Sequence, residues 1–227
     1  MDINQFVQTV AIYALPVLFA ITLHEAAHGY VARHFGDMTA YAQGRISLNP
    51  ARHIEIVGTI VVPLLVFLTS SLNFLLGWAK PVPVNYSALR KPRLHMTLVA
   101  AAGPAANLVM ILAWALVLKL AAALPLNSTT AVVGEIAKAG IFANLILMTV
   151  NLLPILPLDG GQIVAGMLPS RAGRLFKRLE PYTTHVLGVL VVAAIVDAIL
   201  NESRMLSKVF EPLARFARYL IRLIVGG

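Results

Sequence analysis

The chain has 227 residues, of which 59% are hydrophobic and only 12% are charged, and its formal net charge is +8. Soluble globular domains carry about 25% charged residues, so this composition excludes most soluble proteins and indicates a protein embedded in lipid. The basic residues cluster between apolar runs, which favours loops that face anionic lipid headgroups over nucleic-acid binding. The chain has no cysteine, which excludes disulfides, thiolate metal ligands and cysteine nucleophiles.

Five apolar runs are long enough to be considered as membrane helices, which need about 20 mostly apolar residues. Free of Asp, Glu, Lys and Arg, they extend over Ile3–Leu23, Ile56–Ala79, Met96–Leu118, Ala139–Leu158 and Pro181–Val196. We expect the first, third and fourth to span the membrane, within a total of about four to six transmembrane or re-entrant helices. The first lacks a basic leader and a small-residue cleavage site, which predicts a retained span rather than a signal peptide.

The loop charges predict an orientation in the cell membrane. Basic residues follow the first, second and fourth runs, whereas the turn around Pro125–Thr130 has none. If basic loops face the cytoplasm, this multi-pass protein has its N-terminus outside. The run Ile56–Ala79 then has both ends on the cytoplasmic side, which predicts a re-entrant segment bent at Pro63, unless the charge rule fails there.

Two short stretches and the tail complete the predicted architecture. Tyr41–Leu48 alternates loosely, and Lys80–Asn85 (KPVPVN) has prolines that only an edge strand tolerates, so we expect short membrane-associated β segments. From Glu202 onward, basic residues recur at helical spacing opposite an apolar face. This pattern predicts a basic amphipathic helix at the membrane interface, or else a helix packed on a soluble partner. We therefore expect an all-α polytopic membrane domain over 1–201 and an interfacial helix over 202–227.

The first candidate for chemistry is the motif HEAAH at residues 24–28, where the first run ends. On a helix, His24 and His28 share a face and can bind one metal ion, while Glu25 can take a proton from water at that ion. Ionisable groups at membrane depth are costly and usually functional. The alternative is a pair of interfacial histidines at a helix end.

A third ligand is sought in the stretch NLLPILPLDGG at residues 151–161. Catalytic zinc commonly has three protein ligands, and without cysteine the third must be His, Asp or Glu, for which Asp159 is the candidate. Pro154 and Pro157 disfavour helix, so the fourth span should unwind near its cytoplasmic end. Equally, Asp159 could cap a following helix, with Gln162 completing a capping box.

The third constellation is AGPAAN at residues 102–107, inside the third run. Small residues allow helices to approach closely, and a proline within a span loosens the backbone. Asn107 is then a buried amide that could bond a substrate backbone or an oxyanion. The alternative is that these residues serve helix packing alone.

Together, these patterns resemble the site-2 protease family of intramembrane zinc metalloproteases. The matching motifs are HEAAH at 24–28, GPAAN at 103–107 and NLLPILPLDGG at 151–161, within a resemblance that covers most of Ile3 to Leu168. The stretches SLNPARHIEIVGT and GWAKPVPVN resemble the short bacterial and archaeal branch that lacks PDZ and CBS domains. The run Ile56–Ala79 departs from the compact members, which pass there through a short sheet.

The resemblance implies one zinc ion per chain, held by His24, His28 and Asp159, with Glu25 as general base and then general acid. It also implies substrate-binding or site-organising residues from the same motifs, together with one histidine near the metal. These residues are Asn107, Asn151, Gly103, Pro104, Pro154 and His53.

The implied activity is that of a zinc metalloendopeptidase that cleaves transmembrane segments of other membrane proteins near the cytoplasmic face. A substrate helix must first unwind, and Gly44–Leu48 and Lys80–Asn85 could hold it by strand addition. The expected partners are transmembrane protein substrates and a bilayer with anionic headgroups, without nucleic acid. A catalytically silent scaffold or chaperone is the alternative, although all four site residues are present. A metal-ion transporter is a further alternative. It predicts several polar groups distributed along the spans, whereas here the polar groups cluster at one end.

Overall fold

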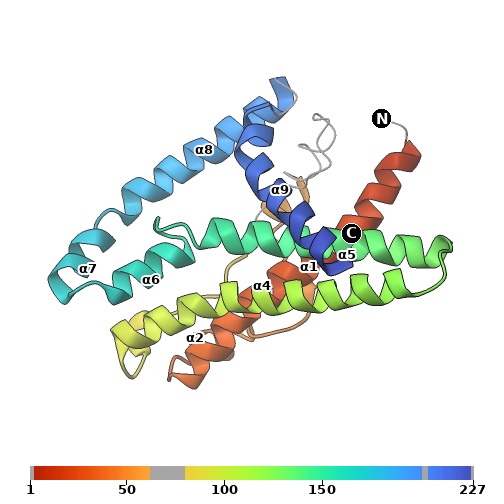
Figure 1. Ribbon diagram of the computed structural model, residues 1–227. Coiled ribbons are helices and arrows are strands. Elements are labelled where there is room, and N and C mark those ends of the chain that lie inside the picture. Colours follow the sequence, from red (N-terminus) through yellow and green to blue (C-terminus); the bar gives the residue numbers. More distant parts are fainter. Residues whose placement is uncertain (1–2, 62–79, 201–203, 226–227) are drawn as a thin grey trace.

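The core of the protein is a bundle of three long helices. The computed structural model describes residues 3–61, 80–200 and 204–225. Within it, α1 (Ile3–His34), α4 (Pro92–Ala123) and α5 (Ser128–Asn151) pack against one another (Figure 1). Among the described residues, these are the three helices long and apolar enough to cross a membrane. They contain the first and third predicted runs and most of the fourth, so the prediction of a helical multi-pass membrane protein is confirmed.

Small residues bring α4 and α5 into close contact. The indole ring of Trp114 on α4 lies against Gly140 of α5, where an added β-carbon would stand 2.5 Å from the indole Cγ and Cε2 atoms. Ile111 and Ile141 are buried in the same cluster. In contrast, the outward side chain of Leu112 is 63% exposed although it is apolar. An apolar outer surface of this kind suits contact with lipid.

The predicted unwinding of the fourth span is confirmed. Helix α5 ends at Asn151, and residues 152–158 form an irregular loop before α6 (Asp159–Met167) begins. Helix α6 packs against α4, and α7 (Ser170–Lys177) follows after a short turn. The loop and α6 therefore return the chain to the α1–α4 pair.

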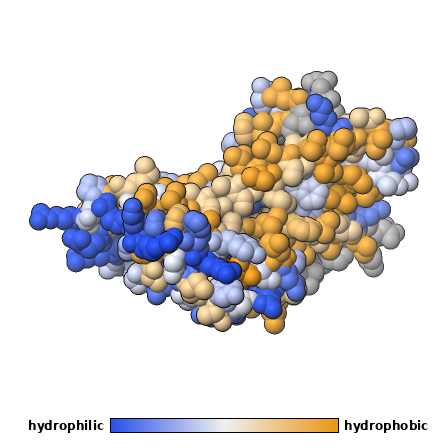
Figure 2. All heavy atoms as spheres, turned by 90° about the horizontal axis from the view of Figure 1, so that it is seen from below, coloured by the Kyte–Doolittle hydropathy of each residue, from blue (hydrophilic) through white to orange (hydrophobic). Residues whose placement is uncertain are grey.

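One end of the molecule is polar. Hydrophilic side chains gather at the left end of the face seen in Figure 2, and apolar side chains cover most of its right half. The left end holds α7 and α2 (Thr39–Ala42) (Figure 1). This separation fits a protein with one end outside the hydrocarbon, while the predicted orientation stays a prediction.

The predicted β segments are not formed in the parts of the chain that the structure describes. Tyr41 and Ala42 belong to the helical turn α2, whose first residue, Thr39, donates its N–H to Asp37. Gly44 then turns the chain with a φ of +61°, which ends any alternation. Lys80–Asn85 is irregular, and side chains rather than a neighbouring strand take up part of its backbone hydrogen bonding.

The connections between α2 and α4 contain three short helical turns, and most of the second predicted run lies between the last two of them in the chain. The turns are η1 (Pro50–Arg52), the π-helical turn η2 (Ile56–Val61) and η3 (Tyr86–Ala88). Residues 62–79 lie outside the described residues, so the re-entrant segment bent at Pro63 stays a prediction.

The last two helices form an extension of the bundle. Helix α8 (Glu180–Leu200), which contains the fifth predicted run, reaches away from the core, and α9 (Arg204–Val225) crosses back to contact α4 and α5 (Figure 1). Helix α9 is thus present where the sequence predicts the C-terminal amphipathic helix. The interfacial position of α9 and the domain boundary at residue 202 stay predictions.

Candidate metal centre

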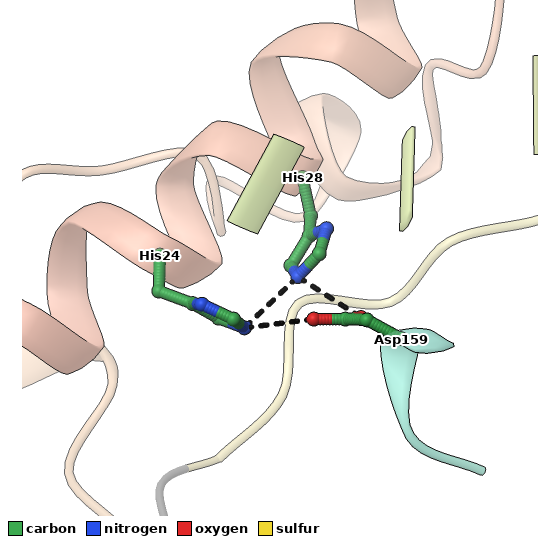
Figure 3. Close-up of side chains that lie close together, drawn as sticks. All are labelled: His24, His28 and Asp159. Atoms are coloured by element: carbon green, nitrogen blue, oxygen red, sulfur yellow. Dashed lines mark hydrogen bonds and ion pairs between the residues drawn. The ribbon is translucent and has the colours of Figure 1, made fainter. Parts of the chain in front are cut away.

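Three side chains from two distant segments converge between α1 and α6. His24 and His28 project from successive turns of α1, and Asp159 is the first residue of α6 (Figure 3). The two histidine Nε2 atoms lie 3.1 Å apart, and the Asp159 carboxylate oxygens lie 3.2 Å from His24 Nε2 and 3.4 Å from His28 Nε2. Three potential ligand atoms thus face one point, as a shared metal ion requires.

The two imidazoles are held with their Nε2 atoms toward this point. His28 Nδ1 lies 2.7 Å from the carbonyl oxygen of Val99, which can only accept, so His28 Nδ1 carries the proton and donates it. His24 Nδ1 in turn lies 2.6 Å from Asn107 Oδ1. In this arrangement both Nε2 atoms present lone pairs to each other and to a carboxylate, a repulsive cluster that a cation relieves. Two neutral imidazoles and one carboxylate are a known donor set for catalytic zinc, so the residues fit that ion.

Asp159 faces the histidines rather than capping α6. Leu158 occupies the N-cap position, no side chain caps that helix end, and Gln162 Oε1 is buried without a hydrogen-bond partner. The capping box predicted as the alternative is therefore wrong. The two carboxylate oxygens of Asp159 instead face the imidazoles of His24 and His28.

The loop before Asp159 folds back tightly on the first turn of α6. A β-carbon on Gly160 would collide with the backbone of Leu152 and Leu153, and one on Gly161 would stand 2.5 Å from the carbonyl carbon of Ile155. Pro154 lies exposed in this loop and is not one of the three converging residues. Asn151 donates its side-chain amide to Leu147 O at the end of α5, and is not one of the three converging residues.

The GPAAN motif brings α4 against the two histidines. An added β-carbon on Gly103 would lie 2.5 Å from His24 Cε1 and 2.7 Å from His24 Nε2, so only glycine leaves room for the imidazoles. Pro104 is buried within α4. Asn107 is fully buried, and its oxygen and nitrogen both contact protein atoms. That burial favours a site-organising role for Asn107 over contact with a substrate.

Glu25 points to the Lys80–Asn85 segment. Its Oε2 accepts the backbone N–H of Val82 over 2.7 Å. Since Glu25 directly follows His24 in the chain, this contact ties the segment to the helix turn that carries the candidate metal ligands. The segment is therefore a neighbour of the candidate centre.

Further contacts hold both ends of the same segment. Lys80 N–H donates to His53 O, and Arg45 donates to Lys80 O over 3.1 Å. At the other end, Asn85 N–H donates over 2.7 Å to Asp37, which is 1% exposed. Charged side chains thus fix the path of a proline-rich stretch that has no strand partner in the described chain.

His53 is buried but does not join the three converging side chains. Its Nε2 lies 2.8 Å from Ser47 O, and its own carbonyl holds Lys80. Of the predicted site residues, His24, His28 and Asp159 therefore come together, with Gly103 and Asn107 packed on them. His53 and Asn151 have other partners.

Three groups around the site escaped the sequence analysis. The carbonyl of Val99 fixes His28, yet a main-chain group leaves no signature in a side-chain pattern. Asp37 follows Gly36 in a loop and resembled an ordinary turn residue. Asn144 contacts Asn107, and a polar side chain within the apolar run Ala139–Leu158 was a signal that could have been followed.

Comparisons with known proteins match the chain to one peptidase family and to named relatives. Residues 120–195, which include Asp159 but not the two histidines, match peptidase family M50. The chain is 35% identical over 211 residues to the "Putative zinc metalloprotease YwhC" of Bacillus subtilis (strain 168), covering 88% of this chain and 92% of that protein. It is 31% identical over 143 residues to the "Putative zinc metalloprotease Rip2" of Mycolicibacterium smegmatis, covering 63% of this chain and 52% of that protein. No solved structure matches.

Proposed function

The chain belongs to peptidase family M50, the site-2 protease family, and on that premise we propose that it is an intramembrane zinc metalloprotease. In this proposal it cleaves peptide bonds within the transmembrane segments of other membrane proteins. The single observation that carries the proposal is the convergence of His24, His28 and Asp159 within a bundle of helices long and apolar enough to span a membrane. One zinc ion per chain is the proposed occupant of that point.

The chemistry needs a proton acceptor and a carbonyl that is open to attack. A bound zinc ion lowers the pKa of a water molecule and polarises a peptide carbonyl. Glu25 takes the proton from water as general base and returns it to the leaving amine as general acid. Asn107 and the Val99 carbonyl hold the two imidazoles in place during the reaction.

A substrate helix has its carbonyls in internal hydrogen bonds, so it must unwind before it can be cut. The Lys80–Asn85 segment, bonded to Glu25 through Val82, and the nearby residues 44–48 are the proposed places where the unwound stretch binds. Pro81 and Pro83 have no N–H, so their side of the segment offers only carbonyl acceptors. The substrate backbone must therefore donate the hydrogen bonds there.

The membrane setting is part of the proposal. The cluster of basic residues around α7 favours a cytoplasmic position for that end, with the N-terminus outside and the active site near the cytoplasmic face. The same charges favour a bilayer with anionic headgroups. The partners are then the transmembrane substrates and that lipid surface.

The test compares metal content and cleavage in purified wild type, Asp159→Ala and Glu25→Gln. Wild type should hold about one zinc per chain, and Asp159→Ala should lose most of it because a catalytic site commonly needs three protein ligands. Glu25→Gln still accepts from Val82 N–H, so it should keep zinc while cleavage falls at least about 100-fold. The substrates are single-span peptides that carry helix-breaking residues at different depths and are embedded in liposomes. Mass spectrometry identifies the bonds that are cut.

The outcomes separate the alternatives. Wild type without zinc, or Asp159→Ala with full zinc, overturns the metal centre. A wild type that holds zinc but cuts no peptide, or a Glu25→Gln variant as active as wild type, favours the silent scaffold or chaperone. Cuts confined to soluble parts of the peptides overturn the intramembrane assignment.

A further inference from the structure

Asn144 lies behind the candidate metal centre, where it contacts Asn107, the residue that in turn contacts His24. Resting on the proposed function, we propose that Asn144 is a positioning residue that acts through Asn107. It fixes the proton of His24 on Nδ1, so that the Nε2 lone pair faces the metal ion. Asn144 touches no candidate ligand in this scheme and belongs to none of the three motifs that carry the family resemblance.

A continuous line of hydrogen bonds supports this role. Asn144 Nδ2 donates to Gly140 O over 2.8 Å, and Asn107 Nδ2 donates to Asn144 Oδ1 over 2.9 Å. Asn107 Oδ1 then lies 2.6 Å from His24 Nδ1. The line thus runs from the backbone of α5 through α4 to the imidazole on α1.

The Gly140 carbonyl, at the end of the line away from His24, decides which group donates and which accepts in every hydrogen bond of the line. Gly140 O is a carbonyl and can only accept, so the NH₂ group of Asn144 must face it. The Asn144 oxygen then faces Asn107, whose NH₂ group must donate to it. The Asn107 oxygen is left to accept from His24, and the His24 Nδ1 must carry the proton.

The reverse orientation is disfavoured at each step. Turning the Asn107 amide over would place its oxygen against two other oxygens, Asn144 Oδ1 and the Ala20 carbonyl 3.4 Å away. Turning Asn144 as well would place its oxygen against Gly140 O. A carbonyl that lies well away from the imidazole therefore decides the tautomer of His24.

Burial makes this control strict. Both asparagine side chains have 0% exposure. Water is thus excluded as a substitute partner for either amide, and an unpaired polar group at this depth is costly. Asn107 retains Ala20 O as an acceptor, but the 3.4 Å contact is long, so Asn144 supplies its better-placed partner.

Zinc affinity tests the proposal directly, without an assay of cleavage. Asn144→Leu keeps the number of side-chain heavy atoms and their branching at Cγ, and it removes both hydrogen bonds. We expect zinc affinity, measured by competition with a chelator, to fall about tenfold, in the range found for residues that orient metal ligands. Asn144→Asp keeps an oxygen toward Asn107 and, when protonated, a donor toward Gly140, so it should recover most of the affinity.

The matched control is Leu145→Ala on the same helix. Leu145 is buried beside Asn144 but contributes only packing, so this change should weaken the fold and leave zinc affinity as in wild type. Cobalt substituted for zinc gives visible absorption bands that report ligand geometry. These bands should change in Asn144→Leu and stay unchanged in Leu145→Ala. Should Asn144→Leu fail to fold, Asn144→Thr replaces it, because its hydroxyl can bond Gly140 O but ends too early to reach Asn107.

A double variant shows whether Asn144 acts through Asn107. In an Asn107→Ala background, adding Asn144→Leu should cause no further loss of zinc affinity. A second, equal loss in that background, or unchanged affinity and unchanged cobalt bands in Asn144→Leu, overturns the inference. The Asp159→Ala measurement keeps the two proposals apart. If zinc binding survives Asp159→Ala, the proposed function fails; if it requires Asp159 but not Asn144, this inference alone fails.

Discussion

Gly103 on α4 faces His28 on α1 so closely that one added methyl group would overlap the Nε2 atom of that histidine. The same methyl group would also stand within 2.7 Å of His24 Nε2. Gly103 thus contributes by what it lacks, since both candidate ligand nitrogens occupy the space that a β-carbon would need.

We expect Gly103→Ala to fold as a helix but to lose zinc. Alanine has a higher helix propensity than glycine, so the substitution should not disrupt helix α4. The added methyl group should displace the two imidazoles and thereby lower zinc affinity about 10- to 100-fold. Elemental analysis and chelator competition measure this. The control is Gly134→Ala on α5, where the nearest side-chain atom is 4.0 Å from the added carbon. Equal zinc affinity in the two variants would contradict the steric argument.

The contact of Glu25 with Val82 can be removed without changing the carboxylate. Val82→Pro deletes the N–H that Glu25 accepts, in a segment where the flanking prolines already favour an extended chain. We expect zinc content as in wild type and a slower cleavage step, because Glu25 is less well oriented. Val82→Ala retains the N–H and loses only packing of a buried side chain. If the alanine variant is slowed as much as the proline variant, packing rather than the hydrogen bond matters.

Asp37 should matter for stability although it is not one of the converging ligands. Its two oxygens accept the N–H groups of Thr39 and Asn85, and Asp37→Asn would turn an NH₂ group toward one of these donors. We expect the free energy of unfolding to fall by about 1–3 kcal/mol. Thermal unfolding in detergent measures the loss. Glu211→Gln, which breaks only exposed ion pairs on α9, should change stability by less than about 1 kcal/mol.

Removal of zinc should destabilise the folded chain. A ligand that binds only the folded state adds about 2.7 kcal/mol when present at 100 times its dissociation constant. Chelation should therefore lower the unfolding temperature of wild type and leave that of Asp159→Ala nearly unchanged. A wild type whose unfolding temperature is the same with and without chelator would speak against a site coupled to the fold.

The sequence predicted the parts of the site that depend on local spacing. His24 and His28 are one helical turn apart, so their shared face follows from helix geometry alone. The two prolines after Asn151 predicted the loop that precedes Asp159, and the loop is present. Both predictions needed only residues that are neighbours in the chain.

The errors arose where a neighbouring turn, or a contact with a distant residue, overrides the pattern within one segment. Tyr41–Leu48 alternates like a strand, but Asp37 and Gly44 fold it into a turn. The spacing of Asp159 and Gln162 matches a capping box, yet the histidines on α1 draw the carboxylate away from the helix end. The role of Asn144 depends on which residue of α4 lies opposite, and periodicity within one helix cannot give that.

The separation of the candidate ligands along the chain affects how the proposed metal centre is assembled. The two histidines leave the ribosome early, whereas Asp159 follows roughly 130 residues later, an interval of about 7 to 26 s at ordinary rates of synthesis. During that time the growing chain holds two of the three ligands and lacks α6. Under the proposed function, the proteolytic site therefore cannot be completed until most of the bundle is in place, so neighbouring membrane proteins would not meet a half-built protease.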